Sequence, residues 1–323
     1  MAWYLGLDTS NYTTSAALFE PSEGKMISCR RLLDVSQGKI GLKQSDAVFA
    51  HVKRLPELLS QAYEQAEHPA VRAVGVSVRP RDLEGSYMPC FLVGELSAVS
   101  ASNAANAPLY RFSHQAGHIA AALYATGKLE LRHQKFIAFH VSGGTTECLL
   151  VQPSDKEGVP FSVEIIAQSL DLKGGQAIDR VGTMLGLPFP AGRYLDELAS
   201  RCEKTFKIRP TMKGADCCLS GIENQCRKLI DAGTPAEEVA KYCITSVEAA
   251  VDAMTAAVLE KYGNLPLLYA GGVMSNSQIQ KNLSRKYGGA FAPAVYSSDN
   301  ACGIAVLAAL AAGEELEGKG GIL

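Results

Sequence analysis

Two segments of the chain share one design, in which a buried strand, a polar turn and a returning strand follow each other. The first, WYLGLDTSNYTTSAALFE, covers residues 3–20, and the second, KFIAFHVSGGTTECLLVQP, covers residues 135–153. Their turns are rich in Asp, Thr, Ser, Asn and Gly, the residues that tight connections between strands require. Alternating helical and strand patterns follow each opening. Because the same plan begins twice, the sequence predicts a duplicated α/β fold.

The repeat divides the chain of 323 residues into two lobes, in keeping with its length. We expect the first lobe to cover residues 1–110 and the second to cover residues 111–300. The Ala-rich segment 301–318 is predicted to form a helix that packs back on the first lobe. Sheets of this kind bind ligands beyond the carboxyl ends of their strands, here in a central cleft between the lobes.

Composition argues against several classes of protein. The formal net charge of −2 provides no global basic field, although it does not exclude a local basic patch. The nine cysteines are odd in number and form no CxxC pair, which favours reduced thiols and a cytoplasmic location over a disulfide framework. The N-terminus lacks the basic and apolar parts of a secretory signal. No run of about 20 apolar residues predicts a membrane span.

Three polar or Gly-rich turns follow predicted strands, at residues 8–15, 141–147 and 270–276. The backbone N–H groups of such turns form concavities that bind anions, and hydroxyl groups add donors. Any one of these turns is more often an ordinary hairpin or helix cap, but three of them at strand ends favour a nucleotide site. The sequence contains neither a G-x-G-x-x-G fingerprint nor a Walker A motif. The nucleotide would therefore bind in another kind of cleft.

Two histidines, His114 and His118, lie four residues apart in a predicted helix, where they share one face and can bind one metal ion. Such a pair by itself is more often structural than metal-binding. No Glu follows His114, so the H-E-x-x-H signature of metallopeptidases is missing. Asp299, at a predicted strand-to-helix junction, offers a third ligand. Two imidazoles and one carboxylate suit iron(II) or zinc and leave positions open for substrate.

Five motifs occur along the chain in a recognisable order. They are HQAGH (114–118), HVSGGT (140–145), SLDLKGGQAIDRVGTMLGLPFPAG (169–192), AGGVMSN (270–276) and SSDNACGIA (297–305). Each is similar to a motif of the threonylcarbamoyl-adenosine synthases of tRNA modification, also called the glycoprotease family. The resemblance covers most of the chain. It implies the duplicated actin-like, sugar-kinase and chaperone-ATPase (ASKHA) fold.

The resemblance also implies a set of site residues. His114, His118 and Asp299 correspond to the family's metal ligands, and Asp179 corresponds to a carboxylate that accepts hydrogen bonds from ribose hydroxyls. Gly192 would allow the backbone to approach the nucleotide, which is AMP, ATP or an acyl-adenylate. The positions implied to contact this nucleotide are His140, Val141, Ser142, Gly143, Gly144, Asp179, Gly192 and Asn276.

The implied reaction is the metal-dependent transfer of a threonylcarbamoyl group from an adenylate to an adenosine of tRNA, with release of AMP. One divalent metal ion, iron or zinc, would act as Lewis acid and template. The implied partners are tRNA and other proteins of the threonylcarbamoyl pathway, and the chain is expected to form a homodimer or heterodimer without membrane association.

Departures from the family's motifs lie at polar positions. Thr13 stands where the family has an acidic residue, Thr145 where it has His, Gln176 where it has Glu, and Glu223 where it has Lys. The chain thus resembles a divergent paralogue, and two alternatives stay open. It could be a non-catalytic nucleotide-binding paralogue that acts as partner or scaffold of an authentic synthase. The minor alternative is a metallopeptidase, against which the missing Glu after His114 argues.

Overall fold

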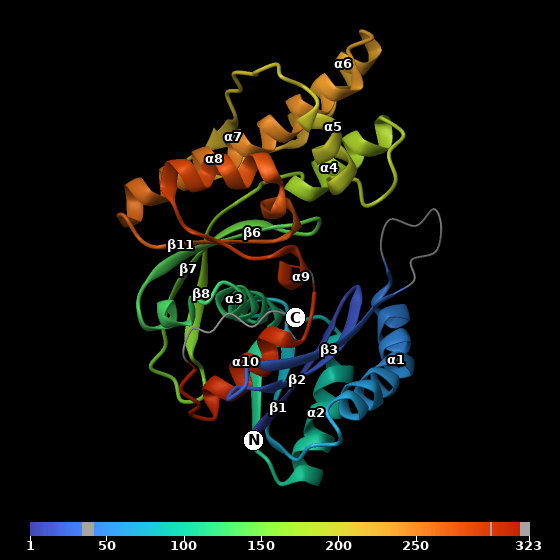
Figure 1. Cartoon of the computed structure of the whole chain (residues 1–323), viewed down its shortest axis with the longest axis vertical. Coiled ribbons are helices and arrows are strands. Elements are labelled where there is room, and N and C mark those ends of the chain that lie inside the picture. The colour runs from blue at the N-terminus through green and yellow to red at the C-terminus, as the bar shows by residue number, and fades with distance from the viewer. Residues whose placement is uncertain (34–41, 298, 317–323) are drawn as a thin grey trace. The chain divides into compact units, whose positions relative to one another are not determined.

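The computed structural model of the chain describes residues 1–33, 42–297 and 299–316 (Figure 1). It divides into two compact units, which we describe separately. The first unit contains Met1–Gln134, Gln152–Val163 and Val295–Leu323, and the second contains Lys135–Val151 and Glu164–Ala294. The first unit therefore extends beyond the boundary expected near residue 110. It does so because the strand and helix that follow residue 108 belong to the first sheet and its covering layer.

The first unit is built on a five-stranded mixed sheet with the order β3-β2-β1-β4-β5. β1 pairs antiparallel with β2 and parallel with β4, while β2 pairs antiparallel with β3 and β4 pairs parallel with β5. The β1 and β2 strands, which form a hairpin, are buried along their whole length. The strands are β1 (Trp3–Ser10), β2 (Thr13–Glu20), β3 (Lys25–Leu32), β4 (Val71–Arg79) and β5 (Leu109–Ser113).

Helices cover both faces of this sheet (Figure 1). Side chains alternate along β1, so Leu5 and Leu7 pack with Leu55 and Leu58 of α1 in one apolar cluster, whereas Gly6 lies against α10 on the opposite face. The helices of this unit are α1 (Gln44–Gln65), α2 (Phe91–Ala105), α3 (His114–Ala125), η1 (Leu129–His133) and α10 (Cys302–Ala311), with α9 (Ala294–Ser297) at its border. The helix expected over 301–318 is shorter in the structure, because α10 ends at Ala311 and residues 312–316 form a turn and an irregular segment. Residues 317 and 318 lie outside the described residues.

The second unit repeats the strand order of the first, as β12-β11-β6-β7-β8. β6 pairs antiparallel with β7 and parallel with β11, which matches the pairing of β1 with β2 and β4. A two-stranded sheet of β9 and β10 is added. The strands are β6 (Phe136–Val141), β7 (Thr146–Pro153), β8 (Phe161–Gln168), β9 (Thr211–Lys213), β10 (Asp216–Cys218), β11 (Leu267–Ala270) and β12 (Ala290–Phe291).

The helices of the second unit gather around one long central helix, α7, which contacts α4, α5, α6 and α8. By length and composition α7 is apolar enough to cross a membrane, a test that core helices also pass. Val247 and Met254 of α7 are buried in the unit's core together with Phe139 of β6 and Tyr269 of β11. The helices are α4 (Gly174–Met184), α5 (Gly192–Ser200), α6 (Ser220–Asp231), α7 (Ala236–Tyr262), η2 (Gly272–Ser275) and α8 (Ser277–Tyr287).

Glycines allow α10 to approach its neighbours closely in the first unit. A Cβ atom on Gly303 would overlap the carbonyl oxygen of Gly117 in α3 and would lie 2.8 Å from the backbone nitrogen of Ala121. On the other side of α10, a Cβ atom on Gly6 would lie 2.5 Å from the backbone oxygen of Ala301. Helix α10 therefore packs between α3 and β1 with backbone-to-backbone distances so short that only glycine fits at Gly303 and Gly6.

We expect Gly303→Ala to destabilise the protein by about 3 kcal/mol or more, because the added methyl group meets helix backbone that cannot move alone. Gly117→Ala is the matched control. Its Cβ would lie 2.8 Å from Cδ1 and 3.2 Å from Cγ1 of Ile304, and no backbone atom of α10 would lie closer than 3.9 Å. Ala is also the better helix former, so the effect should stay within about 1 kcal/mol. Urea denaturation followed by circular dichroism measures both. A wild-type unfolding midpoint for Gly303→Ala would contradict this close packing of α10 against α3.

Candidate functional site

Two histidines are placed on one face of α3 by the start of that helix. Ser113 is its N-cap, and the Ser113 hydroxyl oxygen accepts a hydrogen bond from the backbone N–H of Ala116 at 3.0 Å. The alanines that follow favour the helix. His114 and His118 then lie one turn apart, and their rings meet edge to face with centroids separated by 4.4 Å. The His118 side chain is buried and that of His114 is nearly so.

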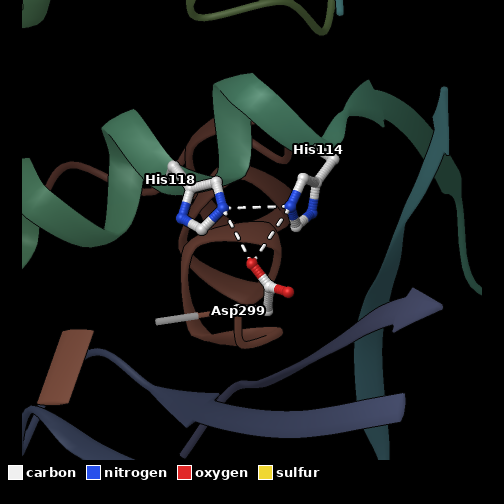
Figure 2. Close-up of side chains that lie close together, drawn as sticks. All are labelled: His114, His118 and Asp299. Carbon is white, nitrogen blue, oxygen red and sulfur yellow. Dashed lines mark hydrogen bonds and ion pairs between the residues drawn. The ribbon is translucent and has the colours of Figure 1, made fainter. Parts of the chain in front are cut away.

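Asp299 approaches this pair from the segment that leads into α10, almost 200 residues later in the chain (Figure 2). The Nε2 atoms of the two histidines are 2.9 Å apart, and Asp299 Oδ1 lies 3.5 Å from His114 Nε2 and 3.3 Å from His118 Nε2. The three ligand atoms all lie within 4.8 Å of one another. The structure thus brings together the three residues that the sequence proposed as metal ligands, all of them within the first unit.

A second carboxylate, Asp8 of β1, orients His114. Asp8 Oδ1 lies 2.9 Å from His114 Nδ1 and accepts a hydrogen bond from the Ser77 hydroxyl group. When His114 Nδ1 donates its proton to Asp8, the lone pair of Nε2 points toward His118 and Asp299. A carboxylate behind a histidine is the arrangement that commonly orients imidazole ligands of metals. Asp8 is fully buried, and its Oδ2 has no hydrogen-bond partner among the described residues.

The electrostatics of this cluster favour a bound cation. Burial lowers the pKa of His114, but the carboxylates of Asp8 and Asp299 outweigh it and raise that pKa to about 10. Burial raises the pKa of Asp299, but hydrogen bonds from His114 and His118 outweigh it and hold the pKa well below its usual range. The donor set and the surplus of negative charge therefore fit a divalent cation, which would compete with a proton for His114.

Two residues of the first sheet, one in β2 and one in β3, hold Asp299 in place. The Thr13 hydroxyl group donates to Asp299 Oδ2 at 3.3 Å, and the Arg30 guanidinium donates to the Asp299 backbone oxygen at 3.4 Å. Thr13 stands where the family resemblance led us to expect an acidic residue. A hydroxyl group at this position donates to the carboxylate, whereas a second carboxylate would repel it.

Three Gly-containing segments pack together in the second unit. The β6–β7 turn is closed by a hydrogen bond of 2.7 Å from the Ser142 N–H to the Thr145 oxygen. The N-terminus of α4 lies directly on this turn, because the Gly175 N–H donates to the Ser142 oxygen at 3.1 Å and a Cβ atom on Gly175 would lie 2.6 Å from Gly143 N. Gly271, with φ +99°, packs on Val141. The backbone of the turn is exposed at Gly143 and Gly144.

The remaining residues of the proposed nucleotide site also lie in the second unit. His140 is the last residue but one of β6 and is buried. Asp179 of α4 accepts the Ala191 N–H at 2.8 Å, and burial raises its pKa. Gly192 begins α5, and a Cβ atom there would meet no atom within 4 Å. Asn276 caps α8, since its Oδ1 accepts the backbone N–H groups of the next turn at 3.1 Å.

Glu223, the second notable departure from the family pattern, is paired with two cations. Its carboxylate lies 2.8 Å from Arg180 of α4 and 3.2 Å from Arg227 of α6. The hydrogen bond and charge of Arg180 lower the pKa of Glu223. The position therefore keeps positive charge nearby, because one carboxylate stands between two guanidinium groups.

Sequence reasoning missed Asp8 as part of this cluster. We assigned Asp8 to a polar turn, whereas β1 runs on to Ser10 and carries the Asp8 side chain into the interior. A signal was present in the sequence, because a carboxylate at the end of a buried strand needs a partner. The identity of that partner, His114, follows only from the pairing of β1 with β4 and of β4 with β5.

Comparison with known proteins gives consistent results along the chain. The model of a family described as tRNA N6-adenosine threonylcarbamoyltransferase matches residues 36–306. A curated protein of that name from Limosilactobacillus reuteri is 30% identical over 292 residues, which cover 86% of this chain and 80% of the relative. Another, from Thermus thermophilus, is 29% identical over 327 residues and covers 95% of this chain and 92% of the relative.

Solved structures with similar folds confirm the fold expected from the sequence. Full-length HypF superposes with a TM-score of 0.58 at 15% identity, over 99% of this chain and 56% of that chain. Component A of (R)-2-hydroxyglutaryl-CoA dehydratase from Acidaminococcus fermentans has a TM-score of 0.55 at 13% identity, and the match covers 97% of this chain and 100% of that chain. A ROK hexokinase from Thermus thermophilus has a TM-score of 0.52 at 14% identity, and the match covers 95% of this chain and 98% of that chain. These proteins share the duplicated actin-like fold.

We expect His118→Ala and Asp299→Ala each to reduce bound iron or zinc from about one ion per chain to a small fraction, because two ligands hold a divalent ion poorly. His133→Ala, which removes an exposed histidine of η1, is the control and should keep the wild-type content. Elemental analysis of protein purified without chelators measures the stoichiometry. Equal metal content in all four proteins would exclude this cluster as the binding site.

Proposed function

The chain belongs to the tRNA N6-adenosine threonylcarbamoyltransferase family, a family of acyltransferases. From this premise we propose that it converts an adenosine of tRNA to threonylcarbamoyladenosine. In the proposed reaction the exocyclic amine of an adenosine in tRNA attacks the carbamoyl carbon of threonylcarbamoyl adenylate. The new C–N bond forms, the bond from that carbon to the phosphate oxygen breaks, and AMP leaves. The family match over 36–306 carries this proposal.

We propose that His114, His118 and Asp299 bind one iron or zinc ion. When bound, the ion would supply Lewis-acid polarisation and a template for the substrate. The contribution of the chain is to fix the ligands. Asp8 holds the tautomer of His114, and Thr13 fixes the orientation of the Asp299 carboxylate. These contacts come from β1, β2 and α3, so the cluster is positioned by regular elements of the fold.

The second unit supplies the groups proposed to bind the adenylate. The exposed backbone of Gly143 and Gly144 offers N–H groups to phosphate oxygens, and Ser142 adds a hydroxyl group. His140 and Val141 lead into this turn. Asp179 Oδ1 accepts the backbone N–H of Ala191, the residue before Gly192, and this contact fixes the carboxylate. The other carboxylate oxygen is suited to accept hydrogen bonds from ribose hydroxyls. Asn276 completes the proposed set.

The comparisons favour a transferase over the alternatives considered from the sequence. The curated relatives that match most of the chain carry the name of a tRNA-modifying transferase. We therefore do not favour a non-catalytic partner or a metallopeptidase. The proposed location is the cytoplasm, where tRNA and a reducing environment for the nine free cysteines are found. Other proteins of the threonylcarbamoyl pathway are the proposed partners.

Deletion of the gene should abolish threonylcarbamoyladenosine in bulk tRNA, as measured by mass spectrometry of tRNA nucleosides. A plasmid copy of the wild-type gene or of His133→Ala should restore the nucleoside. His118→Ala should restore less than about 1% of it, because losing one metal ligand removes several kcal/mol of charge stabilisation. An unchanged nucleoside profile in the deletion strain would refute the proposed function.

Asp179→Ala is expected to weaken binding of AMP or a stable adenylate analogue about tenfold, because a carboxylate that accepts ribose hydroxyls contributes roughly 1.5 kcal/mol or more. Asp179→Asn is the matched variant. Its side-chain oxygen can still accept the Ala191 N–H, so α5 should stay in place. If both Asp179→Asn and Asp179→Ala lose affinity, the loss is due to the ribose contact and not to a displaced α5. Isothermal titration calorimetry measures both, and wild-type affinity for the Ala variant would remove Asp179 from the site.

A further inference from the structure

Residues 206–213 of the second unit, FKIRPTMK, alternate strictly between partly buried and exposed side chains. The segment lies between α5 and β10 and ends in β9. Side chains of an extended chain alternate between two sides, so one side of this segment faces the protein and the other faces solvent. The partly buried residues are Phe206, Ile208, Pro210 and Met212, and the exposed residues are Lys207, Arg209, Thr211 and Lys213.

The inward side of the segment is anchored to α7 and to the core. The ring of Phe206 meets the ring of Tyr242 edge to face at 5.4 Å, and Met212 packs against the apolar core of the unit. Just before the segment, the Lys204 ammonium group lies 2.6 Å from Glu238 of α7. These contacts fix the backbone. The exposed side chains are therefore presented from a segment that is anchored at both ends.

The exposed side carries three cationic side chains. Lys207, Arg209 and Lys213 form no ion pair and no side-chain hydrogen bond with any residue in the described part of the chain. Asp216 lies opposite Lys213 in the β9–β10 pair, but its Oδ1 accepts the backbone N–H of Gln168 at 2.8 Å. We call Lys207, Arg209 and Lys213 the basic ribbon. It stands out in a chain whose formal net charge is −2.

We propose that the basic ribbon binds the phosphate backbone of the RNA substrate, an inference that rests on the proposed function. The three cations share the exposed side of one short segment, an arrangement suited to contact with successive phosphates of a strand. The one aromatic side chain of the segment, Phe206, is packed on Tyr242 and is not available to stack on bases. The ribbon therefore holds and orients RNA through its backbone and does not select its sequence.

The experiment compares full-length wild type with the triple variant Lys207→Ala, Arg209→Ala, Lys213→Ala. The control triple variant is Lys261→Ala, Lys281→Ala, Arg285→Ala, which removes the same charge from other exposed positions of the second unit. Fluorescence anisotropy measures binding of an unmodified tRNA transcript between 50 and 200 mM salt. The ribbon variant should bind at least about tenfold more weakly, and its plot of log affinity against log salt should be shallower by about 2.

The control variant should keep the wild-type salt slope, and all three proteins should keep the same melting temperature and affinity for AMP. Wild type that does not bind the transcript, or a ribbon variant with wild-type affinity and slope, overturns the inference. The same assay is run with poly-glutamate as a second ligand. A ribbon variant that loses affinity for poly-glutamate but not for the transcript also overturns the inference, because it assigns the basic ribbon to an acidic protein partner. Loss of threonylcarbamoyladenosine in the deletion strain tests the proposed function separately, so the two proposals fail by different results.

Discussion

The close packing of α10 between α3 and β1 is the constraint on which the candidate metal centre depends. Gly303 of α10 touches the backbone of Gly117, which lies between the two histidines of α3, and Gly6 of β1 touches the opposite side of α10. Asp299 precedes α10 by three residues. Because these backbones approach as closely as glycine allows, the Asp299 carboxylate arrives within 3.5 Å of both imidazoles. A wider helix spacing would separate the ligands.

Where α10 packs on α3 and β1, two carboxylates, Asp8 and Asp299, lie close to His114. Asp8 is fully buried, and Asp299 lies close to it across His114. Two carboxylates so placed favour a positive charge between them, and they raise the pKa of His114. A divalent cation bound there would provide this charge with both imidazoles neutral. The electrostatics of the candidate site therefore favour a cation.

Two of the departures from the family's motifs are compensated by neighbouring residues. Thr13 replaces an expected acid and donates a hydrogen bond to Asp299. Glu223 replaces an expected lysine, yet it lies between Arg180 and Arg227. In both places the local charge is balanced by a neighbour that the motif alone does not reveal. These compensations agree with the family membership shown by the match over 36–306.

The sequence by itself determined the duplicated plan, because the repeated strand–turn–strand pattern depends on local periodicity and turn chemistry, and the five ordered motifs indicated the family and the candidate ligands. Tertiary structure decided what depends on contacts between distant segments. It placed β5 and α3 in the first unit, since β5 pairs with β4, and it revealed Asp8 as the partner of His114. It also showed which cations are paired and which, as on 206–213, are not. No local pattern encodes such pairings, because they arise when the fold brings residues that are far apart in the chain within hydrogen-bonding distance.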